Sequence, residues 1–127
     1  SITMKKVIAT VDAPKAVGPY SQAIEVNGTL YISGQIPVNP ADGKIQEEIT
    51  AAAHQSLKNI GAILKEAGMT YDNVVKTTVL LADIADFKAV NEVYAEYFTG
   101  DKPARACYQA AALPLGVKVE IEAIAVK

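Results

Sequence analysis

The sequence predicts an α+β fold in which two helices cover one face of a mixed sheet. Short apolar segments and two longer segments with apolar residues at helical spacing follow one another in the order β-β-β-α-β-α-β-β. Each helix connects two strands, and right-handed crossovers place both helices on the same side of the sheet. The chain of 127 residues is expected to form one domain (1–127) with its own hydrophobic core.

The first part of the chain contains three predicted strands. Residues 5–10 form the first. Residues 22–26 and 29–33 flank Asn27-Gly28, a dipeptide that strongly predicts a two-residue hairpin turn because both residues tolerate positive φ. The second and third strands are therefore expected to pair as a hairpin.

Two predicted helices connect the later strands. In the first, residues 47–67, apolar side chains recur at helical spacing, and Gly68 follows at the position of a left-handed cap. The second begins near residue 83 or 86 and ends at residue 98. The remaining strands are predicted at residues 74–82, 104–111 and 117–126.

The last predicted strand indicates what the uncovered face of the sheet carries. Charged residues at 118, 120 and 122 alternate with apolar residues at 119, 121 and 123, so one face packs on the helices. The other face combines charges with Ile124 and further apolar side chains. Because 50% of the chain is hydrophobic and 20% charged, we expect this face to be buried against sister subunits, with exposure to water as the alternative.

Composition excludes several classes of protein. A net charge of -2 argues against nucleic acid as a main partner, and no apolar run is long enough to span a bilayer. The N-terminus lacks the apolar core of a signal peptide, and the single cysteine fits a reducing compartment, so a cytoplasmic location is expected. Ser1-Ile2-Thr3 precede Met4 and are interpreted as a cloning remnant.

Residue counts also exclude several catalytic schemes. A Ser-His-Asp triad or a Cys-His pair would have to use His54, the one histidine, which lies off the apolar stripe of the first helix and is predicted to be solvated. One His and one Cys do not suffice for a zinc site built from such ligands. Gly18, Gly28 and Gly34 do not form a phosphate loop or a dinucleotide-binding fingerprint.

The one arginine of the chain is the first candidate site residue. Arg105 follows Pro103-Ala104 in an apolar stretch. The only other basic residue of that stretch is Lys102. A guanidinium offers a planar fork of donors that matches both oxygens of a carboxylate, which indicates an anion clamp. A surface arginine or a structural ion pair is the alternative. Cys107 leaves the same strand face and is either part of that site or a small buried apolar residue.

A carboxyl group is the second candidate. Glu120 lies in mid-strand among apolar neighbours. If it faces a cleft between subunits, loss of solvent raises its pKa and suits it to general acid or base work on a water molecule. An exposed strand position is the alternative, and we adopt it for Glu122.

Short motifs occur along nearly the whole chain in a characteristic order and spacing. They are Gly18-Pro19-Tyr20-Ser21-Gln22-Ala23, Ser33-Gly34-Gln35-Ile36-Pro37, Val90-Asn91, Pro103-Ala104-Arg105 with Cys107, Leu113-Pro114 and Val119-Glu120-Ile121-Glu122-Ala123. Together they resemble the signatures of the reactive-intermediate deaminases (the Rid or YjgF-type family), and the Arg, Cys and Glu pattern is similar to that of the RidA subgroup.

This resemblance implies a chorismate-mutase-like fold and a homotrimer with clefts between subunits. It also implies enamine/imine deaminase activity on 2-aminoacrylate and related 2-imino acids, giving a 2-keto acid and ammonia without a metal or organic cofactor. Arg105 matches the carboxylate clamp of the family and Glu120 its water-orienting acid. The positions that line the cleft in the family match Tyr20, Ser33, Gly34, Phe87, Asn91 and Cys107.

Two other functions remain open at this point. A regulatory protein could bind a small carboxylate in the same cleft without turnover, and it would need Arg105 but not a nearby acid. Members of the family have also been described as endoribonucleases or translation inhibitors. An acidic chain whose longest basic run is Lys5-Lys6 argues against that activity here.

Overall fold

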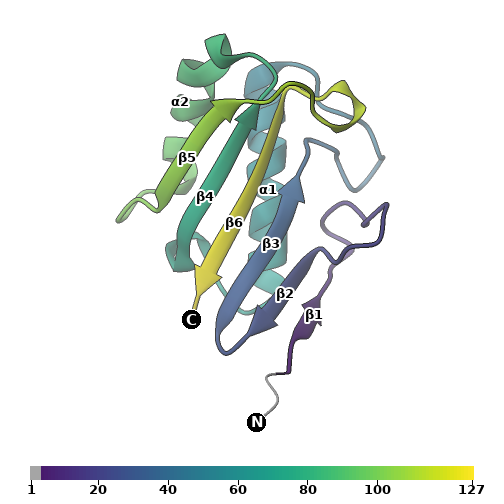
Figure 1. Ribbon diagram of the computed structural model, residues 1–127, viewed down its shortest axis with the longest axis vertical. Coiled ribbons are helices and arrows are strands. Elements are labelled where there is room, and N and C mark those ends of the chain that lie inside the picture. Colours follow the sequence, from purple (N-terminus) through teal and green to yellow (C-terminus); the bar gives the residue numbers. More distant parts are fainter. Residues whose placement is uncertain (1–3) are drawn as a thin grey trace.

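The computed structural model describes residues 4–127, so the interpretation of Ser1-Ile2-Thr3 lies outside the described residues. Two α-helices, α1 (Ile49–Glu66) and α2 (Phe87–Tyr97), lie behind one sheet in this part of the chain (Figure 1). The strands are β1 (Lys6–Ile8), β2 (Ala23–Val26), β3 (Thr29–Gln35), β4 (Val74–Leu81), β5 (Ala104–Gln109) and β6 (Val119–Val126). The predicted order of elements is confirmed.

The sheet has the strand order β1-β2-β3-β6-β4-β5. Neighbouring strands are antiparallel except β4 and β5, which are parallel, so the sheet is mixed as predicted. β5 forms one edge because α2 carries the chain from β4 across to it (Figure 1). This crossover places α2 beside β5, where the predicted clamp lies.

Local signals in the sequence explain the turns. Asn27 and Gly28 have φ of 51° and 80°, as a two-residue hairpin between β2 and β3 requires. Glu48 caps α1 because its carboxylate accepts a hydrogen bond from the Ala51 amide at 2.8 Å. Gly68, with φ of 74°, follows the helix end in the left-handed conformation expected there.

Some predicted boundaries were too wide. The first strand is shorter than residues 5–10, and β5 ends at Gln109. β6 begins at Val119 because a 3-10 turn, Pro114–Gly116, precedes it and Leu115 takes a φ of 56°. α2 begins at Phe87 because the Asp83 side chain caps a separate 3-10 turn, Ile84–Asp86.

The core lies between the helices and one face of the sheet. On β6, Val119, Ile121 and Ala123 are at most 3% exposed, whereas Glu120 and Glu122 point to the other face. The predicted alternation is therefore confirmed. Burial of each large side chain in this layer stabilises the fold by about 1.5–3 kcal/mol.

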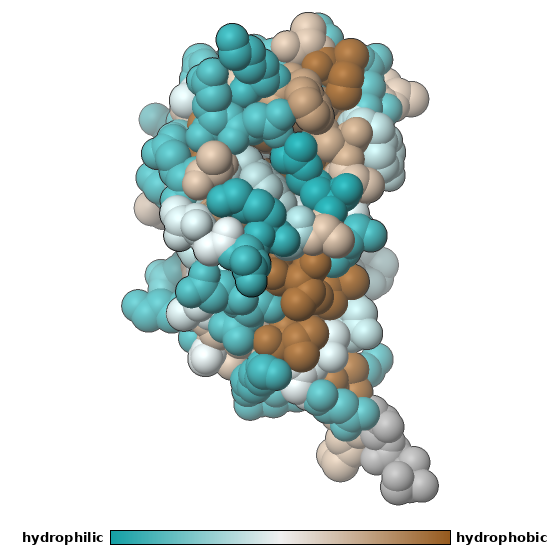
Figure 2. Space-filling view, turned by 90° about the vertical axis from the view of Figure 1, so that its left-hand side faces the viewer, coloured by the Kyte–Doolittle hydropathy of each residue, from teal (hydrophilic) through white to brown (hydrophobic). Residues whose placement is uncertain are grey.

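The opposite face of the sheet carries an apolar row. Val7 pairs with Ile24, Ile24 with Tyr31 and Tyr31 with Ile124, so these side chains share one face of four neighbouring strands. Neither helix covers this face (Figure 1), and 57% of Val7 and 49% of Tyr31 are exposed. Seen from the side, the molecule shows hydrophobic patches between hydrophilic atoms (Figure 2).

His54 is not the solvated residue that the sequence predicted. Its side chain is 31% exposed, and its Nδ1 lies 2.7 Å from the Tyr97 hydroxyl. Its Nε2 lies 3.8 Å from a carboxylate oxygen of Glu96. The prediction was wrong because His54 lies on the flank of α1 that packs against α2.

Neither helix among residues 4–127 has the length and apolar content needed to cross a bilayer.

Candidate active site

The environment of Arg105 is built by one face of α2. Phe87, Asn91 and Tyr94 follow one another at helical spacing, so their side chains lie together. Arg105 Nη1 donates a hydrogen bond to Asn91 Oδ1 at 2.8 Å. The guanidinium carbon lies 4.8 Å from the centre of the Tyr94 ring and 5.5 Å from that of Phe87. Helix and edge strand together therefore hold a half-buried cation.

Arg105 has no carboxylate partner in the part of the chain that the structure describes. Among residues 4–127, the ion pair found between a lysine and a carboxylate joins Lys127 to Glu25, and the other close contact to a carboxylate is that of His54 with Glu96. A structural ion pair therefore does not account for Arg105, whose charge is available to an external anion. Aromatic rings and an amide hold the guanidinium without neutralising it.

Cys107 lies beside Arg105 on the same face of β5 and is half-buried. Burial raises the pKa of its thiol, an effect only partly offset by the nearby Arg105 charge. The thiol therefore stays protonated near neutral pH. A protonated thiol is a poor nucleophile, so this residue is better suited to lining a site than to covalent chemistry.

Glu120 lies on the opposite, open face of the sheet. Burial raises the pKa of its carboxyl group, and the negative charge of Glu122 raises it further. The carboxyl group lies directly over Gly34: a Cβ atom at position 34 would be 2.5 Å from Glu120 Oε2. At this point β3 has a register shift between Ile32 and Gln35. The missing side chain at Gly34 therefore makes room for the carboxylate.

Ser33, the residue before Gly34, and Tyr20 contribute to one cavity. The Ser33 hydroxyl donates to the carbonyl of Ser21 at 2.6 Å, which ties the loop before β2 to β3. Tyr20 is 50% exposed. Both side chains line a cavity of about 410 Å³ together with Lys5 and Tyr31.

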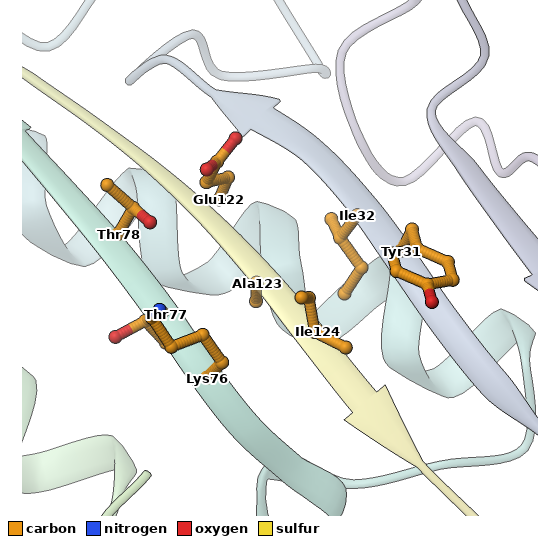
Figure 3. A pocket seen from close by; sticks show the side chains of 8 residues that line it. All are labelled: Tyr31, Ile32, Lys76, Thr77, Thr78, Glu122, Ala123 and Ile124. Carbon is orange, nitrogen blue, oxygen red and sulfur yellow. The ribbon is translucent and has the colours of Figure 1, made fainter. Parts of the chain in front are cut away.

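A second cavity of about 240 Å³ lies across β3, β6 and β4. Figure 3 shows its lining residues on these strands: Tyr31, Ile32, Lys76, Thr77, Thr78, Glu122, Ala123 and Ile124. Neither cavity is lined by Arg105 or Glu120. Arg105 and Glu120 therefore lie outside these two cavities.

The sheet register separates the candidate residues into two groups. Arg105 pairs with Thr77, and Glu120 pairs with Leu80, three residues further along β4. Residues an odd number apart on a strand face opposite sides, so Arg105 and Glu120 lie on opposite faces. Phe87, Asn91 and Cys107 accompany Arg105 and form the clamp group. Gly34 lies under Glu120, Ser33 precedes Gly34 on β3, and Tyr20 shares a cavity with Ser33; we call these four residues the acid group.

Sequence reasoning missed Tyr94 as a neighbour of Arg105. Its position on the apolar stripe of the second helix indicated only a core residue. Tyr94 is indeed 7% exposed, yet its ring faces the guanidinium. The spacing of Phe87, Asn91 and Tyr94 was the available signal.

The chain is similar to known proteins over nearly its whole length. Residues 10–127 match the sequence model of the family described as Endoribonuclease L-PSP. The mouse (Mus musculus) protein named 2-iminobutanoate/2-iminopropanoate deaminase is 57% identical over 128 residues, which cover 100% of this chain and 95% of that protein. Reactive Intermediate Deaminase A, chloroplastic, of Arabidopsis thaliana is 52% identical over 98% of this chain and 67% of that protein. The chain belongs to the reactive-intermediate deaminase (Rid) family.

Two solved structures have the same fold. The YjgF gene product of E. coli superposes with a TM-score of 0.93 at 46% identity, covering 96% of this chain and 98% of the other. E. coli TdcF, solved with bound serine, superposes with a TM-score of 0.93 at 43% identity and the same coverage. The fold that the sequence motifs implied is thereby confirmed.

Proposed function

We propose that this Rid-family chain is a hydrolytic deaminase of reactive 2-imino and 2-enamino acids, with 2-aminoacrylate and 2-iminobutyrate as expected substrates. Relatives over the full length of the chain are named as deaminases of this kind. Arg105 is the observation that carries the proposal. Its guanidinium is held by Asn91 and two aromatic rings, and no carboxylate among residues 4–127 neutralises it. A substrate carboxylate would complete its coordination.

The chemistry follows from the two charged groups. Arg105 holds the carboxylate through two parallel hydrogen bonds, which orients the neighbouring C=N carbon. Glu120 accepts a proton from a water molecule as its oxygen bonds to that carbon, giving a carbinolamine. The same carboxyl group returns the proton to the nitrogen. The C–N bond then breaks as the carbinolamine hydroxyl becomes the C=O and gives its proton to the Glu120 carboxylate, and a 2-keto acid and ammonia leave. Because the pKa of Glu120 is raised, it lies closer to neutral pH, and a group with such a pKa can both accept and donate a proton.

The proposal requires a second copy of the chain. Arg105 and Glu120 lie on opposite faces of one sheet, so a single chain does not present both to one small molecule. In a homotrimer, the clamp group of one subunit would meet the acid group of its neighbour in a cleft. The uncovered apolar row of Val7, Ile24, Tyr31 and Ile124 supports such an assembly, because association would bury it.

The other functions fit the chain less well. A ribonuclease needs cationic surface for phosphates and groups that move protons, whereas this chain has a net charge of -2 and its one His is bonded to Tyr97. The serine bound to E. coli TdcF is compatible with simple carboxylate binding, but binding alone gives Glu120 no role. We expect a cytoplasmic location, although one relative is named chloroplastic.

A coupled assay tests the proposal. A dehydratase acting on serine or threonine generates the enamine, and release of the 2-keto acid is followed with and without this protein. Faster release that scales with protein concentration supports the proposal, and release at the spontaneous rate would refute it. Light scattering on the same sample is expected to report a homotrimer. A stable monomer would remove the cleft and with it the mechanism.

A further inference from the structure

We propose that Tyr94, held by Thr77, is a positioning residue that fixes the plane of the Arg105 guanidinium and thereby the orientation of the substrate carboxylate. This inference rests on the proposed function. It concerns a residue that does not touch the substrate itself and that the sequence motifs did not include.

The first argument is the contact between the ring and the cation. The Tyr94 ring centre lies 4.8 Å from the guanidinium carbon, closer than the 5.5 Å of Phe87. Tyr94 is 7% exposed, whereas Phe87 is 40% exposed. A cation over a desolvated ring is held more strongly than one over an exposed ring. Tyr94 is therefore the firmer of the two supports.

The second argument is that Tyr94 is itself locked in place. Its hydroxyl lies 2.6 Å from Thr77 Oγ1, and Thr77 is fully buried. Phe98, which follows the last residue of α2, packs its ring against that of Tyr94 at 4.5 Å between centres. Burial raises the pKa of Tyr94, so the ring remains a neutral phenol at physiological pH.

The third argument is that Thr77, Tyr94 and Arg105 contact one another in a closed loop. Thr77 pairs with Arg105 in the β4–β5 register, so the residue that holds Tyr94 is the neighbour of the arginine across the ladder. The Arg105 side chain returns to the same ring. A valine and a phenylalanine would fill this space without two buried hydroxyl groups. The polar pair instead sets the direction of the ring relative to the strand that carries Arg105.

The consequence for binding is geometric. A bidentate carboxylate must lie in the plane of the guanidinium. Asn91 takes one donor of Arg105, and the guanidinium carbon lies over the Tyr94 ring, so these two contacts limit the turning of the group and leave its other donors to the ligand. Without the ring, the guanidinium would turn about its long side chain and hold the carboxylate less well.

The binding experiment uses Tyr94→Leu and the full-length protein. Calorimetry with 2-oxobutyrate should show Kd raised by about 3- to 30-fold, the range of one desolvated cation–ring contact. Tyr94→Phe keeps the ring over the cation but loses the hydrogen bond to Thr77, so its Kd should lie between those of the parent and Tyr94→Leu. The matched control is Tyr97→Leu, since Tyr97 also lies on α2 and has a bonded hydroxyl but does not contact Arg105. It should leave Kd unchanged. Equal affinity of Tyr94→Leu and the parent would overturn the inference.

Fluorinated phenylalanines at position 94 keep the inference testable if Tyr94→Leu fails to fold. Each fluorine makes the electrostatic potential of the ring face less negative with little change in shape, so Kd should rise stepwise with each fluorine. A ring that serves only as core packing would give no trend.

A ligand-free measurement separates this inference from the proposed function. Arg105 is the one arginine of the chain, so its side-chain Nε–H gives a single arginine signal in a ¹⁵N spectrum. Removal of the ring should shift and broaden that signal, and an unchanged signal would show that Tyr94 does not position Arg105. If the parent neither binds 2-oxobutyrate nor hastens imine hydrolysis, the proposed function fails whatever this signal does.

Discussion

Replacement of Gly34 by Ala should lower the deaminase activity and leave the stability of the fold nearly unchanged. The added Cβ atom would lie 2.5 Å from Glu120 Oε2, 2.9 Å from its Cδ and 3.1 Å from its Cγ. These are the end atoms of a flexible side chain, so the carboxyl group can withdraw while the backbone stays in place. Gly34 does not have the positive φ that disfavours alanine.

The size of the effect follows from these distances. Ordinary contact begins near 3.4 Å, so Oε2 must retreat by about 1 Å. A misplacement of about 1 Å in a catalytic group can cost about 100-fold in rate. The free energy of unfolding should change by less than about 1 kcal/mol, because the moved group is half-buried and can find water.

The assay is the coupled release of 2-keto acid, with thermal unfolding measured on the same sample. Gly100→Ala is the matched control. Its new Cβ atom would meet Asp72 Oδ1 at an ordinary contact distance of 3.7 Å and would not touch the acid group. The Gly34→Ala/Glu120→Gln double variant should be no slower than Glu120→Gln alone, since both changes act on one group.

Turnover by Gly34→Ala at the rate of the parent would refute this reasoning. It would mean that the position of the Glu120 carboxyl group over Gly34 has no bearing on the reaction. A loss of activity accompanied by a large drop in melting temperature would instead point to a general disturbance of β3.

Four further predictions use other parts of the molecule. Arg105→Lys should lower kcat/KM by about 100-fold without unfolding the chain, because lysine keeps the charge but loses the planar fork; parental kinetics would exclude the clamp. Glu120→Gln should retain 2-oxobutyrate binding in calorimetry and lose turnover. The pKa of Glu120 is raised in the folded state, so the protonated side chain stabilises the fold in acid, and this stabilisation is lost as pH rises through that pKa. Over the same pH range, the free energy of unfolding of Glu120→Gln should therefore increase relative to that of the parent. Urea titrations at several pH values measure this difference. Cys107→Ala should keep most of the activity, and a covalent adduct on Cys107 detected by mass spectrometry during turnover would contradict this. Ser56→Ala should stabilise the fold by about 1 kcal/mol in denaturant unfolding, because the buried Ser56 hydroxyl finds no hydrogen-bond partner among residues 4–127; a lower midpoint would show that it has one.

The fold was largely predictable because its signals are local. The Asn27-Gly28 turn, the cap at Gly68 and the alternation along β6 each depend on a few adjacent residues. Period-2 and helical spacing reflect backbone geometry, so they survive without knowledge of the tertiary contacts. Strand ends were less predictable because capping side chains such as that of Asp83 decide them.

The sequence by itself determined which residue types could form a site: one arginine, one mid-strand acid and a set of motifs around them. Only the tertiary structure decided how they are placed. The β4–β5 register puts Arg105 and Glu120 on opposite faces, and the crossover through α2 brings Tyr94 under the guanidinium. Packing of α1 on α2 buries part of His54, which helical periodicity had assigned to solvent. The physical reason is that chemical identity is a property of each residue, whereas proximity depends on contacts between elements far apart in the chain.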